Sequence, residues 1–175
     1  QPSARLAWVV YATGSGAGWQ VTVDAHSGEI AGAPIDINRY VNGTGRVFTV
    51  NAVVATQNNT LEDMNDSASA VPASAYATVT LQGLTGNTYL DGSYASSRKT
   101  SRRVSSATHN FSYTREAVGF SEVMVYHWLD VSQRYIQSLG FTNVNNRQTV
   151  YSVNKLKQDN AYYTPRSGEL SFGTG

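Results

Sequence analysis

Residues 159–175 read Asp-Asn-Ala-Tyr-Tyr-Thr-Pro-Arg-Ser-Gly-Glu-Leu-Ser-Phe-Gly-Thr-Gly. The tetrapeptide Pro-Arg-Ser-Gly at 165–168 has the composition of a β-turn. The residues on its two sides, 161–163 and 169–172, are rich in aromatic and aliphatic side chains, which are typical of β-strands. The stretch therefore predicts a hairpin, with Asn160 at the start of its first strand.

The first strand of this hairpin has residues suited to holding a peptide if the strand lies at the edge of a sheet. An extended peptide can add to an exposed sheet edge and pair its backbone with that of the edge strand. The side-chain amide of Asn160 can both donate and accept hydrogen bonds there. The alternative is that Asn160 only satisfies the backbone of a turn, and the dipeptide Asn160-Ala161 does not decide between the two.

The segment from Phe120 to Leu139 is the one long helix that the sequence predicts. Its apolar residues recur at three- and four-residue spacing, which gives one stripe along about 30 Å of helix. Ser121 is placed to cap the start of the helix, and Gly140 is placed to end it. We expect the stripe to face the core, and it consists of Phe120, Val123, Met124, His127, Trp128, Val131, Tyr135 and Leu139.

Shorter β-strands are predicted before and after this helix, from apolar runs and turn signals. The runs at 5–12 and 19–25 flank a glycine-rich turn and predict a hairpin. The Asn-, Asp- and Ser-rich stretch 56–74 predicts a surface loop. Further strands are expected within 45–54, 76–84, 88–92, 108–113 and 150–153.

The composition excludes several classes of function. The 175 residues include no cysteine, so disulfides, thiolate metal sites and cysteine nucleophiles are absent. A net charge of +1 argues against nucleic acid or an anionic membrane as a partner, and no apolar stretch approaches the ~20 residues that span a bilayer. The low charged fraction of 14% suits a β-rich secreted protein. The basic run at 98–103 is expected to be a solvated loop, or alternatively a proteolytic processing site.

The sequence offers no metal site or nucleophile of recognisable spacing. His26, His109 and His127 form no i,i+4 pair, and His127 is expected to be a hydrogen-bonded core residue. The acidic stretch 63–67 begins like a calcium loop but lacks its glycine and its final glutamate, so we expect a solvated loop. No Gly-x-Ser-x-Gly elbow of a serine hydrolase occurs.

Several of these segments together resemble gluzincin zinc metallopeptidases of the fungalysin-like and thermolysin-like families. The similar elements are Asp-Asn-Ala-Tyr-Tyr at 159–163, Phe-Gly-x-Gly at 172–175, the long helix, and the strand with Val47-Phe48. The stretch 19–30, Trp-Gln-Val-Thr-Val-Asp-Ala-His-Ser-Gly-Glu-Ile, resembles the last hairpin of a PepSY-type propeptide module.

The resemblance implies an α+β fold, mainly an antiparallel β-sheet with one long backing helix, plus a small PepSY-like β-hairpin. It implies three parts: residues 1–33 as the C-terminal hairpin of a PepSY-like propeptide module, 34–44 as a linker, and 45–175 as the N-terminal β-rich half of a catalytic domain. Such a half-domain should expose apolar surface where the other half would pack, and self-association is expected.

The function that the resemblance implies is that of the amino-terminal part of a secreted, extracellular zinc metalloendopeptidase made as a zymogen. The zinc-binding His-Glu-x-x-His helix is expected beyond Gly175, so this segment alone is expected to hold no cofactor and to be inactive. The expected partners are a peptide or protein substrate and the remaining C-terminal half of the catalytic domain. The substrate would be held by Asn160 through its amide, by Ala161 through main-chain groups, and by Tyr162 and Tyr163 flanking the cleft.

Two other functions remain open at this stage. One is a non-catalytic module that binds or inhibits a protease, which fits the absence of a metal motif. The other is a β-rich surface adhesion domain, which fits the Thr-, Asn-, Ser- and Gly-rich composition but not the ordered motifs.

Overall fold

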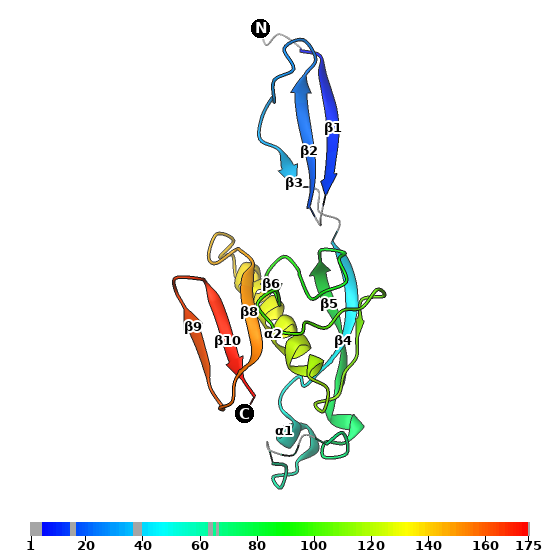
Figure 1. The fold of residues 1–175 in the computed structure, drawn as a ribbon, viewed down its shortest axis with the longest axis vertical. Coiled ribbons are helices and arrows are strands. Elements are labelled where there is room, and N and C mark those ends of the chain that lie inside the picture. The colour runs from blue at the N-terminus through cyan, green and yellow to red at the C-terminus, as the bar shows by residue number, and fades with distance from the viewer. Residues whose placement is uncertain (1–4, 15–16, 37–39, 63–64, 66, 175) are drawn as a thin grey trace. The chain divides into compact units, whose positions relative to one another are not determined.

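The computed structural model describes residues 5–14, 17–36, 40–62, 65 and 67–174, which divide between two compact units, Gln1–Tyr40 and Val41–Gly175 (Figure 1). The division falls inside 34–44, where the sequence predicts a linker, although a strand already begins at Val41. Among the described residues, no helix combines the length and the apolar character needed to cross a membrane.

The amino-terminal unit contains the predicted hairpin. β1 (Ala7–Gly14) pairs antiparallel with β2 (Ala17–Asp24), and β2 also pairs with the short β3 (Ile35–Asp36). Trp8 and Val10 lie on the same face as their partners Val23 and Val21, because side chains alternate along a strand. None of the apolar side chains described between 5 and 36 is buried, so the described part of this unit has no core of its own.

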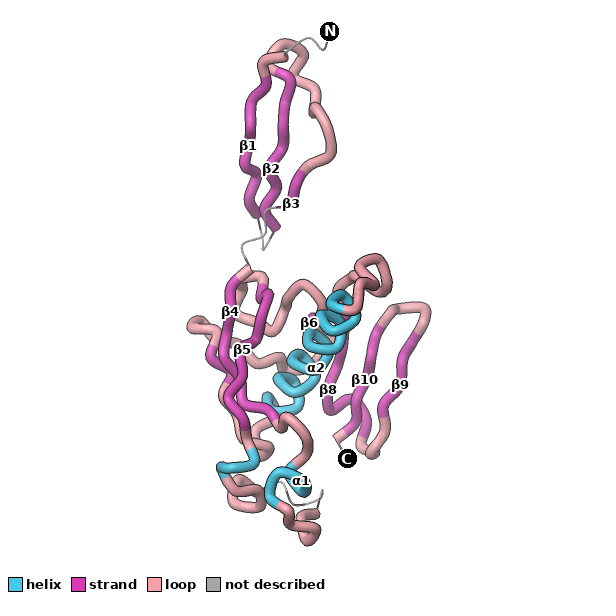
Figure 2. Tube along the Cα trace, turned by 180° about the vertical axis from the view of Figure 1, so that it is seen from behind, coloured by secondary structure: helices cyan, strands magenta, loops and turns pink. Residues whose placement is uncertain are grey.

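The larger unit is built around one long helix, α2 (Gly119–Ser138), which lies between two sheets (Figures 1 and 2). In its described part, one sheet has the strand order β5-β4-β7 and the other has the order β6-β8-β10-β9. The bounds of the first sheet are β4 (Val41–Val47), β5 (Ala77–Leu84) and β7 (Asn110–Phe111). Those of the second are β6 (Ala95–Ser96), β8 (Thr149–Leu156), β9 (Ala161–Thr164) and β10 (Glu169–Gly173).

The two sheets are mixed, whereas the sequence predicted one mainly antiparallel sheet. β4 pairs antiparallel with β5 but parallel with β7, and β8 pairs parallel with both β6 and β10. The fold class α+β, with mostly strands and one long helix, is confirmed. The core fills the space between α2 and the sheets, and its fully enclosed members include Val47, Leu81, Leu84, Leu90, Phe111, Val123, Tyr126 and Tyr151.

The bounds of α2 match the prediction, but its buried face does not. The helix begins at Gly119 without a side-chain cap, so the predicted Ser121 cap is wrong, whereas Gly140 follows the last turn with the left-handed φ that suits a helix end (φ +92°). Trp128 and Val131 from the predicted stripe are exposed, as are Tyr135 and Leu139. The buried side chains of α2 are Phe120, Glu122, Val123, Tyr126, Asp130 and Gln133.

The predicted strand over 45–54 is correct only as far as Val47. The chain then turns, and Ala52–Thr56 forms the helix α1, whose first turn is capped by Asn51 Oδ1 accepting a hydrogen bond from Val54 N (2.8 Å). A second, smaller core cluster joins α1 to the 3-10 helix η1 (Ala73–Ala75). The cap explains the difference, because an asparagine before a short apolar run starts a helix as readily as it interrupts a strand. The predicted second strand over 88–92 is likewise reduced to single bridges at Asp91 and Gly92.

The basic run at 98–103 is not the fully solvated loop that its charge predicts. Arg103 Nη2 lies 2.6 Å from Asp91 Oδ1, its Nε donates to Ser97 Oγ (3.0 Å), and its guanidinium stacks over the Tyr89 ring (4.3 Å). Burial alone would raise the pKa of Asp91, but hydrogen bonds from Arg103 and two neighbouring side chains lower it. Arg103 is therefore part of the framework, while Arg98, Lys99 and Arg102 are exposed.

Candidate peptide-binding edge

The residues that the sequence singled out for peptide binding lie together on β9 and the residue before it. In the described part of the chain, β9 has a strand neighbour on one side only, because it ends the order β6-β8-β10-β9 (Figure 1). Its side chains are accessible, with Tyr162 39% and Tyr163 47% exposed, and Asn160 and Ala161 are exposed as well. An edge strand of this kind presents unpaired backbone groups to a partner.

The register of the β9–β10 hairpin fixes which backbone groups face outward. Gly173 N donates to the Asn160 carbonyl (2.8 Å), and Gly168 N donates to the Thr164 carbonyl (2.8 Å), so residues 160 and 164 face β10. Inward- and outward-facing residues alternate along an antiparallel strand. The N–H and C=O groups of Ala161 and Tyr163 therefore face the open edge.

The side chain of Asn160 lies at this open edge. Its Oδ1 accepts a hydrogen bond from Ala161 N (2.8 Å), and the backbone N–H of Asn160 donates to the Gln158 carbonyl (2.9 Å). The first contact agrees with the alternative in which Asn160 satisfies a nearby backbone group, and the amide nitrogen Nδ2 can still donate to a partner. It also refines the prediction for Ala161: the N–H is already paired, so the carbonyl oxygen is the group left to face a partner.

A polar cluster, in which Ser152, Glu169 and Ser171 are buried and Lys155 is exposed, supports the hairpin from β8. Glu169 Oε1 accepts hydrogen bonds from Lys155 Nζ (2.6 Å), Ser152 Oγ (2.8 Å) and Ser171 Oγ (3.1 Å). The hydrogen bond from Lys155, followed by those from the two serines, lowers the pKa of Glu169, and the Glu169 partner raises the pKa of Lys155. Lys155 also lies over the Tyr162 ring (5.9 Å), which joins the cluster to the edge strand.

The close approach of two backbone segments also positions Asn160. A Cβ at Gly173 would overlap the Gln158 carbonyl oxygen and would lie 3.2 Å from the Asn160 carbonyl oxygen. Only glycine allows this contact, which brings the start of β9 against the end of β10. Gly173 belongs to the Phe-Gly-x-Gly motif, but the periodicity of the sequence did not predict this close approach. It did not predict the Lys155–Glu169 pair either, because both contacts depend on strand order.

The other candidate residues do not form a site. His26, His109 and His127 lie on separate elements, and no group of three metal-ligating side chains occurs among the described residues. His127 is half-buried rather than a core residue, burial lowers its pKa, and it packs edge-on against Trp128. The calcium-like stretch 63–67 includes residues 63, 64 and 66, which lie outside the described residues.

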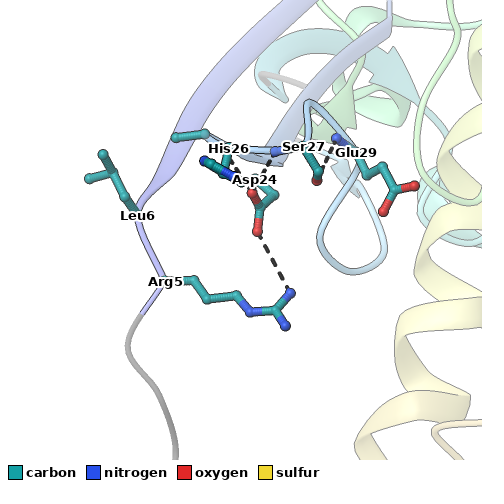
Figure 3. A pocket seen from close by; sticks show the side chains of 7 residues that line it. Arg5, Leu6, Asp24, His26, Ser27 and Glu29 are labelled. Atoms are coloured by element: carbon teal, nitrogen blue, oxygen red, sulfur yellow. Dashed lines mark hydrogen bonds and ion pairs between the residues drawn. The ribbon is translucent and has the colours of Figure 1, made fainter.

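A hollow of about 550 Å³ occurs in the amino-terminal unit, beside Arg5, Asp24 and Glu29 (Figure 3). Asp24 Oδ1 accepts hydrogen bonds from His26 N (2.9 Å) and Ser27 N (3.0 Å), which lower its pKa, and Oδ2 lies 3.7 Å from Arg5 Nη1. Asp24 thus stabilises the turn that follows β2. The carboxylate is used by its own turn, so this hollow carries no separate chemistry.

No protein-family model, curated protein or solved structure matches this chain.

Proposed function

We propose that the chain is the amino-terminal part of a secreted zinc metalloendopeptidase in which β9 holds the substrate as an added strand. The observation that carries the proposal is the outward direction of the Ala161 carbonyl and of both backbone groups of Tyr163, on a strand that has no second strand neighbour in the described part of the chain. An extended peptide could pair with these groups, with the Asn160 amide at one end of the paired segment.

The described residues do not group side chains that could hold zinc, so no catalytic step is assigned to them. The role proposed for this chain is to bind and orient a peptide. Zinc and a general base would come from a segment that carries His-Glu-x-x-His, and a bound zinc ion there would polarise the scissile carbonyl and activate water.

The binding role can be tested on the chain by NMR titration with an uncharged extended peptide of about seven residues. The amide signals of β9 should shift, and a peptide N-methylated at every residue should fail to shift them because it has no backbone N–H donors. Tyr163→Pro should weaken binding, since it removes an outward N–H at an edge position, where proline leaves the pairing with β10 intact. Tyr163→Val, which keeps the N–H, is the matched control. Shifts confined to other elements would contradict the role of β9.

The identity of the parent protein is tested separately. The coding sequence after the Gly175 codon should encode His-Glu-x-x-His within a few tens of residues, and the extended chain should hydrolyse casein in a chelator-sensitive manner. A stop codon there, combined with peptide binding at β9, would instead favour the non-catalytic binding module.

A further inference from the structure

A pocket of about 260 Å³ lies beside the open edge, on the side of the second sheet that faces α2. Leu170 and Tyr163 are register partners on β10 and β9, so they share this face, and Leu129 reaches the pocket from α2. The pocket thus extends from the helix across the sheet to the edge strand. Its lining includes Leu129, Asn145, Arg147, Thr149, Tyr163 and Leu170.

Arg147 is the charged residue of this pocket. Its Nε donates to Asn145 Oδ1 (3.2 Å), which is a neutral acceptor, and no carboxylate is among the lining residues. In the described part of the chain, Arg147 makes no ion pair. Since a guanidinium has five N–H donors in a fixed planar arrangement, most of its hydrogen-bonding capacity is left for a ligand.

The position of Arg147 is set by the helix. Gln133, which is buried, donates from Nε2 to the Val144 carbonyl (3.1 Å) and accepts from Asn145 Nδ2 through Oε1 (3.3 Å). Asn145 has a left-handed backbone (φ +46°), and its carbonyl accepts from Arg147 N (2.7 Å). Asparagine adopts this conformation more readily than other non-glycine residues do. The contacts from Gln133 to Asn145 and from Asn145 to Arg147 place the exposed Arg147 side chain at the pocket that Tyr163 also lines.

We propose that this pocket binds a carboxylate of the peptide held on β9, so that Arg147 selects acidic peptides. The proposal rests on the proposed function. In a strand paired with β9, every second side chain lies on the same face as Tyr163, with Cβ atoms about 5 Å from that of its cross-strand neighbour. A side chain at that position enters the mouth of the pocket, where Arg147 can form charge-assisted hydrogen bonds with a carboxylate.

The test measures binding of dye-labelled heptapeptides to the chain by fluorescence anisotropy. The peptides are acetylated and amidated, and they differ only by Glu or Gln at successive positions. At one position of the peptide, and at neither adjacent position, the Glu peptide should bind about tenfold more tightly than the Gln peptide. This difference in affinity should shrink at high salt. A Gln peptide with a free C-terminus tests whether a terminal carboxylate binds as tightly as a side-chain carboxylate.

Arg147→Gln should abolish the preference for Glu while leaving the affinity for the Gln peptide unchanged. Arg166→Gln removes the same charge from the exposed hairpin turn and should preserve the preference. Arg147→Lys, a second variant in case Arg147→Gln alters folding, should keep part of it. If the preference for Glu survives in Arg147→Gln, this inference is wrong. It is also wrong if the original chain binds the Gln peptide at β9 but shows no preference for Glu. Neither result would contradict the proposed function. Failure of every peptide to bind would overturn the proposed function as well.

Discussion

Lys155 Nζ lies 2.6 Å from Glu169 Oε1, and this contact ties β8 to β10, the strand that pairs with the candidate edge strand β9. The pKa of Glu169 is lowered, so its share of the stability is present above the unfolded carboxyl pKa of about 4.3 and is lost as the pH falls through the lower folded value. The pKa of Lys155 is raised, so its share is present below the unfolded value of about 10.4 and is lost as the pH rises through the higher folded value.

Glu169→Gln should therefore lower the free energy of unfolding at pH 7 and have a smaller effect at pH 3. The loss at pH 7 should be about 1 kcal/mol, because the side chain of Lys155 is 42% exposed and solvent screens the pair. Urea unfolding at the two pH values measures this. Lys157→Gln removes an exposed charge just after β8 and should not lower the free energy of unfolding comparably. If both variants lose equal stability, the Lys155–Glu169 pair is not the cause of the loss in Glu169→Gln.

Glu122 is a buried carboxylate whose surroundings favour its protonated form. Its Oε2 accepts a hydrogen bond from Val104 N (3.0 Å), whereas Oε1 accepts none from any described residue. Burial raises the pKa of Glu122 despite this hydrogen bond and the nearby Arg103. A raised folded pKa means that the protonated form is favoured in the native state, so its contribution is greatest below pH ~4.3 and is lost as the pH rises through the folded value.

Glu122→Gln should consequently be more stable than the original chain at pH 7, on the order of 1 kcal/mol, because it removes a carboxylate whose charged form is disfavoured by burial. The gain should shrink at pH 3, below the unfolded carboxyl pKa of about 4.3, where Glu122 is largely protonated in both the folded and the unfolded chain. Thermal unfolding followed by circular dichroism gives both values. Glu116→Gln, at an exposed position on the approach to α2, is the control, and it should change the stability little at either pH. A destabilised Glu122→Gln at pH 7 would mean that the charge of Glu122 is needed in the fold.

Gly173→Ala should disrupt the candidate edge more than a substitution in the turn does. A methyl group at 173 meets the Gln158 carbonyl oxygen, so the ends of β9 and β10 must separate. In Gly168→Ala the atom nearest to the new methyl group is Tyr163 Oη (4.0 Å). This substitution should therefore lower the free energy of unfolding only by the strain of an alanine in the left-handed conformation, about 1–2 kcal/mol. Unfolding midpoints and the β9 amide signals of the two variants compare these effects. Intact β9 signals in Gly173→Ala would show that the close approach is dispensable.

The sequence predicted the long helix and the hairpins well, but it did not predict which elements pack against them. The period of apolar residues located α2, but it could not show that sheets contact the helix from two sides. Glu122 and Gln133 are buried as well, and their hydrogen-bond partners Val104 and Val144 lie in the loops before and after the helix. Similarly, the turn at 165–168 predicted the hairpin, whereas the position of β9 at an edge depends on the parallel pairing of β8 with β10. Parallel pairing joins segments through long connections and leaves no short-range signal.

The exposed apolar stripe of α2 leads to the last prediction. Trp128, Val131 and Tyr135 are 37%, 38% and 63% exposed, and beside them a groove of about 300 Å³ extends to Phe172 on β10. Contiguous exposed apolar surface of this kind promotes association. The chain should therefore self-associate at high micromolar concentration, as the sequence-based hypothesis of an unpartnered half-domain also expects.

The double substitution Val131→Lys with Tyr135→Lys should weaken this association at least about tenfold without lowering the stability, because lysine favours an exposed helix as much as the residues it replaces. Sedimentation equilibrium measures the association constant. Val50→Lys, at a 61% exposed position outside α2, is the matched control and should leave the constant unchanged. Equal weakening by both variants would indicate a general effect of charge, and no weakening by either would place the contact elsewhere on the molecule.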